Sequence, residues 1–551
     1  MKKYIIPALI SFLFVGCTRD DINNDPNVAY TTIPSTLLTY SQKEQSDYMN
    51  TCSVNENNFR LTMQYWQETT YVNESNYDFA NRNVSNTIFL SNYVNVLNNL
   101  VKAKSIINDY VPDATELATW PGIKKNQLAI IDIMQVYTYQ NLVDTFGNVP
   151  YSQSNQLATI ATPVYDDAAT IYNDLIARLD QDITNLDAGS SLGFGNADLY
   201  YAGNVGKWKK FGSSLLLKLG ITLADSNPAL AQSTVTKALG YGVMSSSADN
   251  CQLQYLAASP NFSPIFENVK ASGRNDFVAG KTLVDVMNAS EDPRRNTFFD
   301  KNLHYTLGKV TSINTTGSVT TIAMNAALPT TPVPVVGDGV YVGGSYLGDI
   351  ATISGNSITI NNIATNPVVA VNNTLQYSYY YKGGTIGALS GFGTNTHLGT
   401  FAYTPTTPGI LLSYTEVAFY LTEASARWGI GGTPTVNYAN AVTSSFADWG
   451  QTSSAAAYLT THPYNAANWK QSVGEQAWLA MYNQPLTSWN FWRRLDYPAL
   501  AAPPTASPIT TVPVRITYPV NESTTNGANW AAAGAAIGGD KLTTKIFWDK
   551  N

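Results

Sequence analysis

Histidine and cysteine are scarce in this chain of 551 residues, which has three of each. The three histidines form no HExxH motif and, together with the cysteines, no cluster with the spacing of a metal site. One cysteine, Cys17, ends the N-terminal apolar stretch, which leaves Cys52 and Cys251 far apart in the sequence. Two such cysteines make no disulfide framework, and the sequence leaves open whether they pair. No metal site is expected.

Charged residues are also few, at 13% of the chain, and 32 basic against 39 acidic side chains give a net charge of −7. No basic run or stripe is present, so nucleic acid is not an expected partner. After the N-terminal segment, no stretch reaches the roughly 18 uninterrupted apolar residues that would span a bilayer. Hydrophobic residues at 44% and aromatic residues at 12% are typical of a globular chain.

The common catalytic and nucleotide-binding motifs are missing as well. There is no P-loop, no GxGxxG and no Asp-rich calcium loop, and the run from Gly343 to Gly348 misses a GxSxG elbow by one position. Paired carboxylates for glycoside hydrolysis need only be close in space, so they stay open as an alternative. Glu416 and Glu423 lie on one expected helix, where we interpret them as a solvated or capping pair. We therefore predict no catalytic residue and no cofactor.

Residues 1–16 have the features of a signal peptide. Two lysines precede an apolar core from Tyr4 to Val15, which is too short to cross a bilayer. The run from Leu13 to Cys17 resembles a bacterial lipobox, with Phe14 at the position where leucine is usual. Cys17 is then the lipidated first residue of the mature chain, and multiple acyl chains would anchor it firmly to a membrane. The alternative is an ordinary signal peptide with an incidental cysteine.

Apolar side chains at helical spacing predict helices over much of the chain. The predicted helices cover residues 92–109, 126–143, 165–186, 207–224, 229–239, 411–428, 438–449 and 469–482. Successive antiparallel pairs, at intervals of roughly 35–45 residues, resemble helical-repeat stacking of the TPR kind. Ser413 and Glu416 resemble a capping box at the start of one helix, and Gly429 ends it.

The composition changes at residues 308–380, where only three residues are charged and Thr, Val, Ile, Gly and Asn dominate. Residues 349–360 and 309–322 each predict a β-hairpin. Leu375 to Tyr381 predicts a strand with alternate tyrosines on one face. This segment is a compact β module inside a helical protein. It is either a surface decoration or a lobe that contacts a ligand or a partner.

Two aromatic segments are candidates for binding. Residues 475–498 contain three of the eleven tryptophans and the pair Arg493 and Arg494, which predicts either a buried aromatic core with a cation–π clasp or a ligand site. Within it, Pro485 is expected to stop a helix. The second segment, residues 58–80, begins helically and ends in a loop rich in tyrosine and asparagine.

The order of several short motifs resembles the SusD-like (SusD/RagB) outer-membrane lipoproteins of Bacteroidetes, in the branch described as SusD-like 2. The resemblance covers nearly the whole chain and rests on the lipobox, Asn24 to Asn27, Phe146 to Tyr151, Gly203 to Leu215, Asp292-Pro293-Arg294, Tyr414 to Ala424, Glu475 to Pro498, and Val514-Arg515 with Tyr518-Pro519. The acidic residues after Cys17 also resemble the surface-export tag of such lipoproteins. The chain departs from the family pattern at residues 308–380, an insertion that lies between the "DPR" motif and Tyr381 to Gly384.

The resemblance implies a mainly α, SusD-like fold with four TPR-like helix pairs, a loop-rich second half and here a small β-rich insertion. It divides the chain into a signal peptide (1–16) and a SusD-like domain (17–551). It also implies a lipid-anchored outer-membrane protein that faces the cell exterior. The implied partner is a SusC-like TonB-dependent transporter, on which the lipoprotein acts as a lid. The implied role is to capture a nutrient without catalysis, usually a glycan and in some members a peptide.

In this framework, Trp66, Tyr71, Asn73 and Tyr77 are the candidate ligand contacts, because aromatic rings stack on sugars and amides bond their hydroxyls. Core packing is the alternative for Trp66. The segment 475–498 then becomes a structural Trp/Arg clasp that ties the last helices to the tail. Three functions stay open: a glycan-binding lid, the same lid with a peptide as cargo, and a surface glycoside hydrolase.

Overall fold

The computed structural model describes residues 32–189, 193–378 and 380–551. The expected signal peptide, the lipidation residue Cys17 and the segment that follows it to residue 31 lie outside the described residues. Within the described ranges, no helix is both long enough and apolar enough to cross a membrane. Cys52 and Cys251 are buried and free, so they do not pair in this structure.

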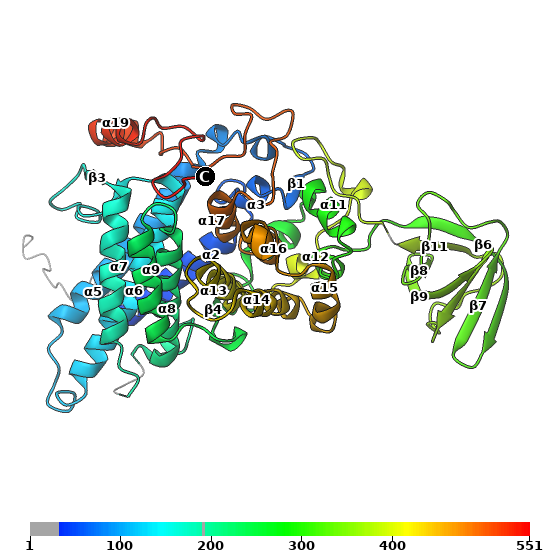
Figure 1. The fold of residues 1–551 in the computed structure, drawn as a ribbon, viewed down its shortest axis with the longest axis horizontal. Helices are drawn as coiled ribbons and strands as arrows, with labels where there is room; N and C mark the ends of the chain where they lie inside the picture. Colours follow the sequence, from blue (N-terminus) through cyan, green and yellow to red (C-terminus); the bar gives the residue numbers. More distant parts are fainter. Residues whose placement is uncertain (1–31, 190–192, 379) are drawn as a thin grey trace, which may run out of the picture.

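Four helix pairs form the helical body of the molecule (Figure 1). They are α2 (Pro34–Asn50) with α5 (Asn98–Asp109), α6 (Trp120–Phe146) with α7 (Ala168–Asn185), α8 (Val205–Thr222) with α9 (Pro228–Tyr241), and α13 (Tyr414–Trp428) with α14 (Pro434–Asp448). Helix α8 also contacts α13 and so joins the first three pairs to the fourth. All four pairs contribute to one continuous core, but α14 does so only through Ala441, and its Tyr438, Val442 and Phe446 pack in a separate small cluster. The mainly α fold with TPR-like pairs is confirmed.

Local sequence signals set the ends of α13. The Ser413 hydroxyl accepts a hydrogen bond from the Glu416 N–H at 3.2 Å, and Gly429 ends the helix with a left-handed φ of 68°. The helix begins at Tyr414 and not at the predicted Leu411. The reason is that β12 (Gly409–Leu412) pairs with β4 (Cys251–Leu253), a long-range contact that helical spacing does not reveal.

The second half contains shorter elements joined by long loops, as expected. They are β5 (Phe277–Ala279), α11 (Lys281–Ala289), α12 (Arg295–Phe298), α15 (Ala455–Thr461), α16 (Trp469–Ala480), α17 (Pro485–Leu495), α18 (Glu522–Thr525) and α19 (Gly527–Ala536). Pro485 follows the end of α16, but it also occupies the first turn of α17, a helix that was not predicted. A proline fits there because the first N–H groups of a helix have no intrahelical partner.

The interpretation of Glu416 and Glu423 as a solvated or capping pair is wrong, because both side chains are fully buried. The Glu416 carboxylate lies 3.0 Å from Lys218 Nζ, and the Glu423 carboxylate lies 2.8 Å from Arg494 Nη1. Asp292 and Arg294, of the "DPR" motif, form a third ion pair, at 2.6 Å, and it too is fully buried. A buried charge needs a partner of opposite charge, and each of these acids has one.

The β-rich insertion is a closed six-stranded barrel that lies beside the helical body (Figure 1). Its antiparallel strands are β6 (Tyr305–Thr316), β7 (Val319–Met324), β8 (Gly339–Val342), β9 (Ser345–Ser354), β10 (Ser357–Asn361) and β11 (Thr374–Ser378). The barrel has its own apolar core. The strand predicted to reach Tyr381 ends at Ser378, so Tyr377 packs inside the barrel whereas Tyr381 packs in the helical body, and Tyr379 lies outside the described residues.

Candidate functional site

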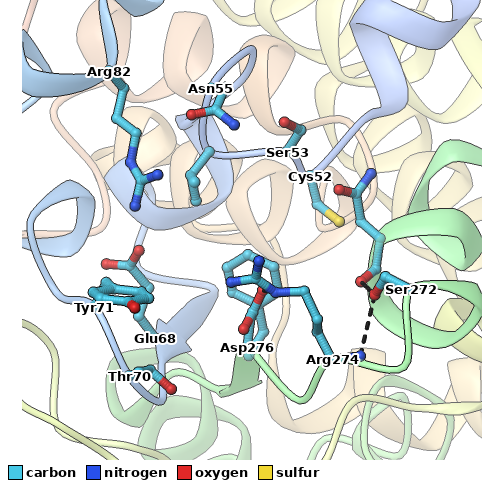
Figure 2. Close-up of a pocket in the computed structure, with 13 residues that line it drawn as sticks. Cys52, Ser53, Asn55, Glu68, Thr70, Tyr71, Arg82, Ser272, Arg274 and Asp276 are labelled. Carbon is cyan, nitrogen blue, oxygen red and sulfur yellow. Dashed lines mark hydrogen bonds and ion pairs between the residues drawn. The ribbon is translucent and has the colours of Figure 1, made fainter.

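A polar pocket with a volume of about 420 Å³ lies where the loop after β1 (Trp66–Glu68) meets the loop before β5 (Figure 2). Its lining includes Cys52, Ser53, Val54, Asn55, Glu68, Thr70, Tyr71, Arg82, Asn268, Ser272, Arg274, Asp276 and Phe277. These residues come from two parts of the chain, residues 52–82 and 268–277, that are far apart in the sequence. We call this cavity the Tyr71 pocket.

A two-stranded sheet joins two walls of the pocket. Strand β1 pairs antiparallel with β5, with Glu68 opposite Phe277. Just beyond the strand, the Thr69 N–H donates to the Asp276 carbonyl at 2.9 Å, and the Thr69 hydroxyl donates to the Asn275 carbonyl at 2.6 Å. These bonds hold the chain that carries Tyr71 beside the chain that carries Arg274 and Asp276.

Two of the four predicted ligand contacts are core residues. Trp66 and Tyr77 are both 0% exposed, and neither lines the pocket. The Trp66 indole N–H donates to the Tyr482 hydroxyl at 2.9 Å, and the Tyr77 hydroxyl accepts from Gln64 Nε2 at 3.0 Å. Burial raises the pKa of Tyr77 to about 12. Both rings support the loop from inside and have no free face on which a ligand could stack.

The other two predicted residues are at the surface. The Tyr71 side chain lines the pocket and is 59% exposed. Asn73 is exposed on the same loop but is not part of the pocket lining, and its Nδ2 donates to Asp78 Oδ2 at 3.4 Å. The structure therefore brings one predicted aromatic ring into a cavity and leaves one predicted amide beside it.

Charged groups of both signs surround Tyr71. Arg82 Nε lies 2.6 Å from Glu74 Oε1, and Arg274 Nε lies 2.6 Å from Asp276 Oδ2. Figure 2 shows Tyr71, Glu68 and Arg82 on one side of the pocket and Arg274 with Asp276 facing them. Because each arginine of the lining is paired with a carboxylate, Glu74 or Asp276, the pocket favours a ligand that is polar but has no large net charge.

Glu68 and the adjacent Glu74 form a buried acid pair under the pocket. Burial, and next the hydrogen bond to Glu74, raise the pKa of Glu68 to about 8. Glu68 Oε2 accepts from the N–H and the hydroxyl of Ser75, at 2.9 and 2.8 Å. At neutral pH Glu68 therefore keeps its proton, and the two carboxyl groups lie within hydrogen-bond reach of each other. They are too close to form the acid and nucleophile or base of a glycosidase, which stand about 5–10 Å apart.

Sequence reasoning did not find Arg82, Arg274 or Asn55, although they line the same pocket as Tyr71. No motif marks them, because they meet only through the pairing of two strands of three residues each. Strands this short give no period-2 signal. Among residues 32–189, 193–378 and 380–551, no group of three or more His, Cys, Asp or Glu side chains could hold a metal ion.

A family model described as "Starch-binding associating with outer membrane" matches residues 25–330 and 364–519. The match leaves out residues 331–363, which are part of the chain that forms the barrel. No protein in a search of the curated proteins matches the chain.

Solved structures with the same fold cover nearly the whole chain. A chitin-binding protein is 22% identical, with a TM-score of 0.70 over 94% of this chain and 100% of its own. A chitin-binding SusD homologue from Flavobacterium johnsoniae is 21% identical, with a TM-score of 0.66 over 94% of this chain and 98% of its own. A SusD homologue from Bacteroides vulgatus is 18% identical, with a TM-score of 0.68 over 93% and 97%. At these identities the likeness establishes a shared fold.

Proposed function

Because the chain belongs to the SusD-like family, in the branch described as starch-binding and associating with the outer membrane, we propose that it captures a glycan at the cell surface and does not cleave it. The Tyr71 pocket is the proposed binding site. The lipid on Cys17 anchors the chain to the outer membrane, on its exterior side. A SusC-like TonB-dependent transporter receives the glycan, and this chain closes over that transporter as its lid.

The observation that carries the proposal is the exposed ring of Tyr71 over a polar, charge-balanced cavity. A tyrosine ring offers an apolar face to the C–H groups of a sugar and a hydroxyl to its polar edge. Arg82, Arg274 and Asn55 place hydrogen-bonding groups in the same lining. Asn73 lies on the same loop and would contact a longer chain that leaves the pocket. Solved structures of the same fold described as chitin-binding support a glycan as the cargo.

Calorimetry with maltoheptaose and with chitohexaose tests the glycan proposal. We expect at least one of them to bind the wild-type chain. Tyr71→Ala should weaken that binding about tenfold or more, which is roughly 1.4 kcal/mol, because it removes the exposed ring on which the sugar rests. The control is Tyr40→Ala, which removes a tyrosine that is similarly exposed, at 46%, on α2. Equal glycan affinity in the wild type and in Tyr71→Ala would show that the Tyr71 pocket is not the binding site.

Cargo and partner need separate measurements. Mass spectrometry of the ligand that co-purifies with the chain distinguishes a glycan from a peptide, and turnover of a glycan panel would show a hydrolase instead.

Affinity purification from detergent-solubilised outer membranes should bring down a TonB-dependent transporter. Cys17→Ala should release the chain from the membrane fraction, because the variant lacks the acyl chains that bind it to the bilayer.

A further inference from the structure

The turn between α5 and α6 carries an apolar patch at the tip of a helical hairpin, which projects from the helical body at the lower left of Figure 1. Its most exposed large side chains are Val111 at 84%, Leu117 at 61% and Tyr110 at 43%. Ala114 and Ala118 are exposed beside them. Single exposed apolar residues are common on protein surfaces, but a group of them on one projecting turn indicates a contact surface. We call this turn the hairpin tip.

Hydrogen bonds within the turn hold these side chains in place. Asp113 Oδ1 accepts from the N–H groups of Thr115 and Glu116, at 2.7 and 3.1 Å. Glu116 Oε2 accepts from the Tyr110 hydroxyl at 2.6 Å. The centroid of the Tyr110 ring lies 4.6 Å from that of Trp120, the first residue of α6. The tip is therefore formed in advance, so a surface that binds it does not have to order it first.

The groups around the tip match the headgroup layer of a lipid bilayer. Tyr110 and Trp120 each combine an apolar ring with a polar edge, and such rings collect at the boundary between lipid and water. Lys102 and Lys125 are exposed on the two helices behind the tip, where long side chains can reach lipid phosphates. The two acids of the turn keep the tip at the level of the headgroups, because a charged side chain is costly among acyl chains.

The described chain begins at the same end of the helical body. Helix α2 packs on α5. The Ser41 hydroxyl donates to the Val96 carbonyl at 3.4 Å. Three residues further along α2, Glu44 accepts from the Asn95 amide at 2.9 Å, so the two helical segments run antiparallel. The start of α2 therefore lies beside the part of α5 that leads into the tip, and Ile33, just before α2, is 53% exposed.

The length of the tether keeps this end of the body near a membrane. Cys17, the proposed lipidated residue, is separated from the start of the described chain by a segment that spans at most about 50 Å when fully extended. Helix α2 then runs about 25 Å away from that end. Cys52 and Ser53, just beyond the end of α2, line the Tyr71 pocket. The hairpin tip and the pocket are thus at opposite ends of α2.

We propose that the hairpin tip is a second membrane contact, at which Val111, Leu117 and Tyr110 rest in the headgroup layer of a lipid bilayer. Its role rests on the proposed function, because the lipid on Cys17 brings the tip to the membrane. A single attachment leaves the body free to turn, whereas two attachments fix its orientation and hold the Tyr71 pocket away from the bilayer. The contact is weak by itself, since a few partly inserted side chains bury less apolar surface than an acyl chain.

An environment-sensitive dye on the tip tests this contact without the anchor. The full chain carries Cys17→Ala and Leu117→Cys, and a nitrobenzoxadiazole dye is attached at residue 117. Cys52 and Cys251 are buried and should stay unlabelled. Added vesicles of phosphatidylcholine should shift the dye emission to the blue, with half-saturation at about 1 mM lipid. Val111→Asp in the same chain should weaken this partition about tenfold or more, because it places a charge in the contact.

The barrel, at the opposite end of the molecule in Figure 1, offers matched controls. A dye on Val336→Cys replaces a side chain that is 62% exposed, and Val368→Asp changes one that is 78% exposed. We expect no blue shift from the first and no effect of the second on the dye at residue 117. These values match the exposure of Leu117 and Val111, so a difference reports on the tip and not on exposure alone.

The outcomes separate the tip from the anchor. No shift at residue 117 up to about 10 mM lipid, or equal shifts at residues 117 and 336, would overturn the membrane contact. Self-association in sedimentation velocity that Val111→Asp abolishes would assign the tip to a second copy of the chain and would also overturn it. If the dye shifts as expected but the double variant Cys17→Ala, Val111→Asp stays in the membrane fraction of cells, the tip contact stands and the proposed lipid anchor is wrong.

Discussion

The guanidinium carbon of Arg493 lies 3.5 Å from the ring centroid of Trp489. It also lies 4.6 Å from that of Trp548, near the C-terminus. Arg493 Nη1 donates to the Val514 carbonyl at 2.9 Å, and Nη2 donates to the Asp144 carbonyl at 2.7 Å. One buried side chain thus joins α17 to α6 and to two parts of the tail, which is the structural clasp that the sequence predicted.

Arg493→Ala should lower the free energy of unfolding by about 3–5 kcal/mol, because it leaves two buried carbonyls without donors and opens a cavity between two indoles. Urea denaturation monitored by tryptophan fluorescence measures the loss. Lys237→Ala is the control, since its ion pair with Asp180 is half exposed and should contribute less than about 1 kcal/mol. A change in glycan affinity with an unchanged unfolding energy would contradict a structural role.

Glu423 provides a second test of buried charge. Glu423→Gln should lower the free energy of unfolding by about 3–5 kcal/mol, because Arg494 would then be buried without a carboxylate. The same acid also holds Arg427, at 2.9 Å, so the loss affects two arginines. Thermal denaturation measures the loss. The control is Asp285→Asn, because Asp285 and its partner Lys281 are both more than half exposed. Equal melting temperatures for the two variants would contradict the burial argument.

The sequence predicted the helices well because their signals are local. Ser413 and Gly429 bound α13 through contacts within a few residues of themselves, and the hairpins of the barrel follow their own turn residues. The Tyr71 pocket could be predicted only in part. The tyrosine-rich loop marked one wall, but which of its rings face outward depends on β1 pairing with β5, some 210 residues away. Glu416 and Glu423 were misplaced for the same reason, since their partners Lys218 and Arg494 are distant in the chain.

The raised pKa of Glu68 makes stability depend on pH. The pKa is about 8 in the folded chain and near the ordinary value of 4.5 in the unfolded chain, so the folded state binds the extra proton between these values. The contribution of protonated Glu68 to the free energy of unfolding is therefore fully present below about pH 4.5 and is lost as the pH rises through about 8. Between these values this free energy falls by at most about 1.4 kcal/mol per pH unit.

Glu68→Gln should remove this dependence, because an amide can keep the bond from Ser75 and donate to Glu74 without titrating. We expect wild type and variant to differ little near pH 5, and the variant to be the more stable of the two near pH 9. Melting temperatures at several pH values give the difference and cancel the other titrating groups. Parallel curves for the two proteins would show that the pKa of Glu68 is not raised in the folded chain.

The barrel should be removable without unfolding the helical body. Tyr305 and Tyr377 are opposite each other on β6 and β11, and paired antiparallel residues have Cα atoms about 4.5–5.5 Å apart. A two-residue Asn-Gly turn can join them in place of residues 306–376. The apolar core of the barrel is separate from that of the helical body, and no residue of the barrel strands lines the Tyr71 pocket.

The excised chain should melt within about 3 °C of the wild type, because the core that holds the four helix pairs together loses no side chain. It should also keep the calorimetric response that Tyr71→Ala removes. The matched control is Ile360→Asp, which puts a charge into the barrel core and should unfold the barrel alone. If either change unfolds the helices as well, the two cores fold as one cooperative unit, and the barrel is then part of the scaffold that holds the Tyr71 pocket in place.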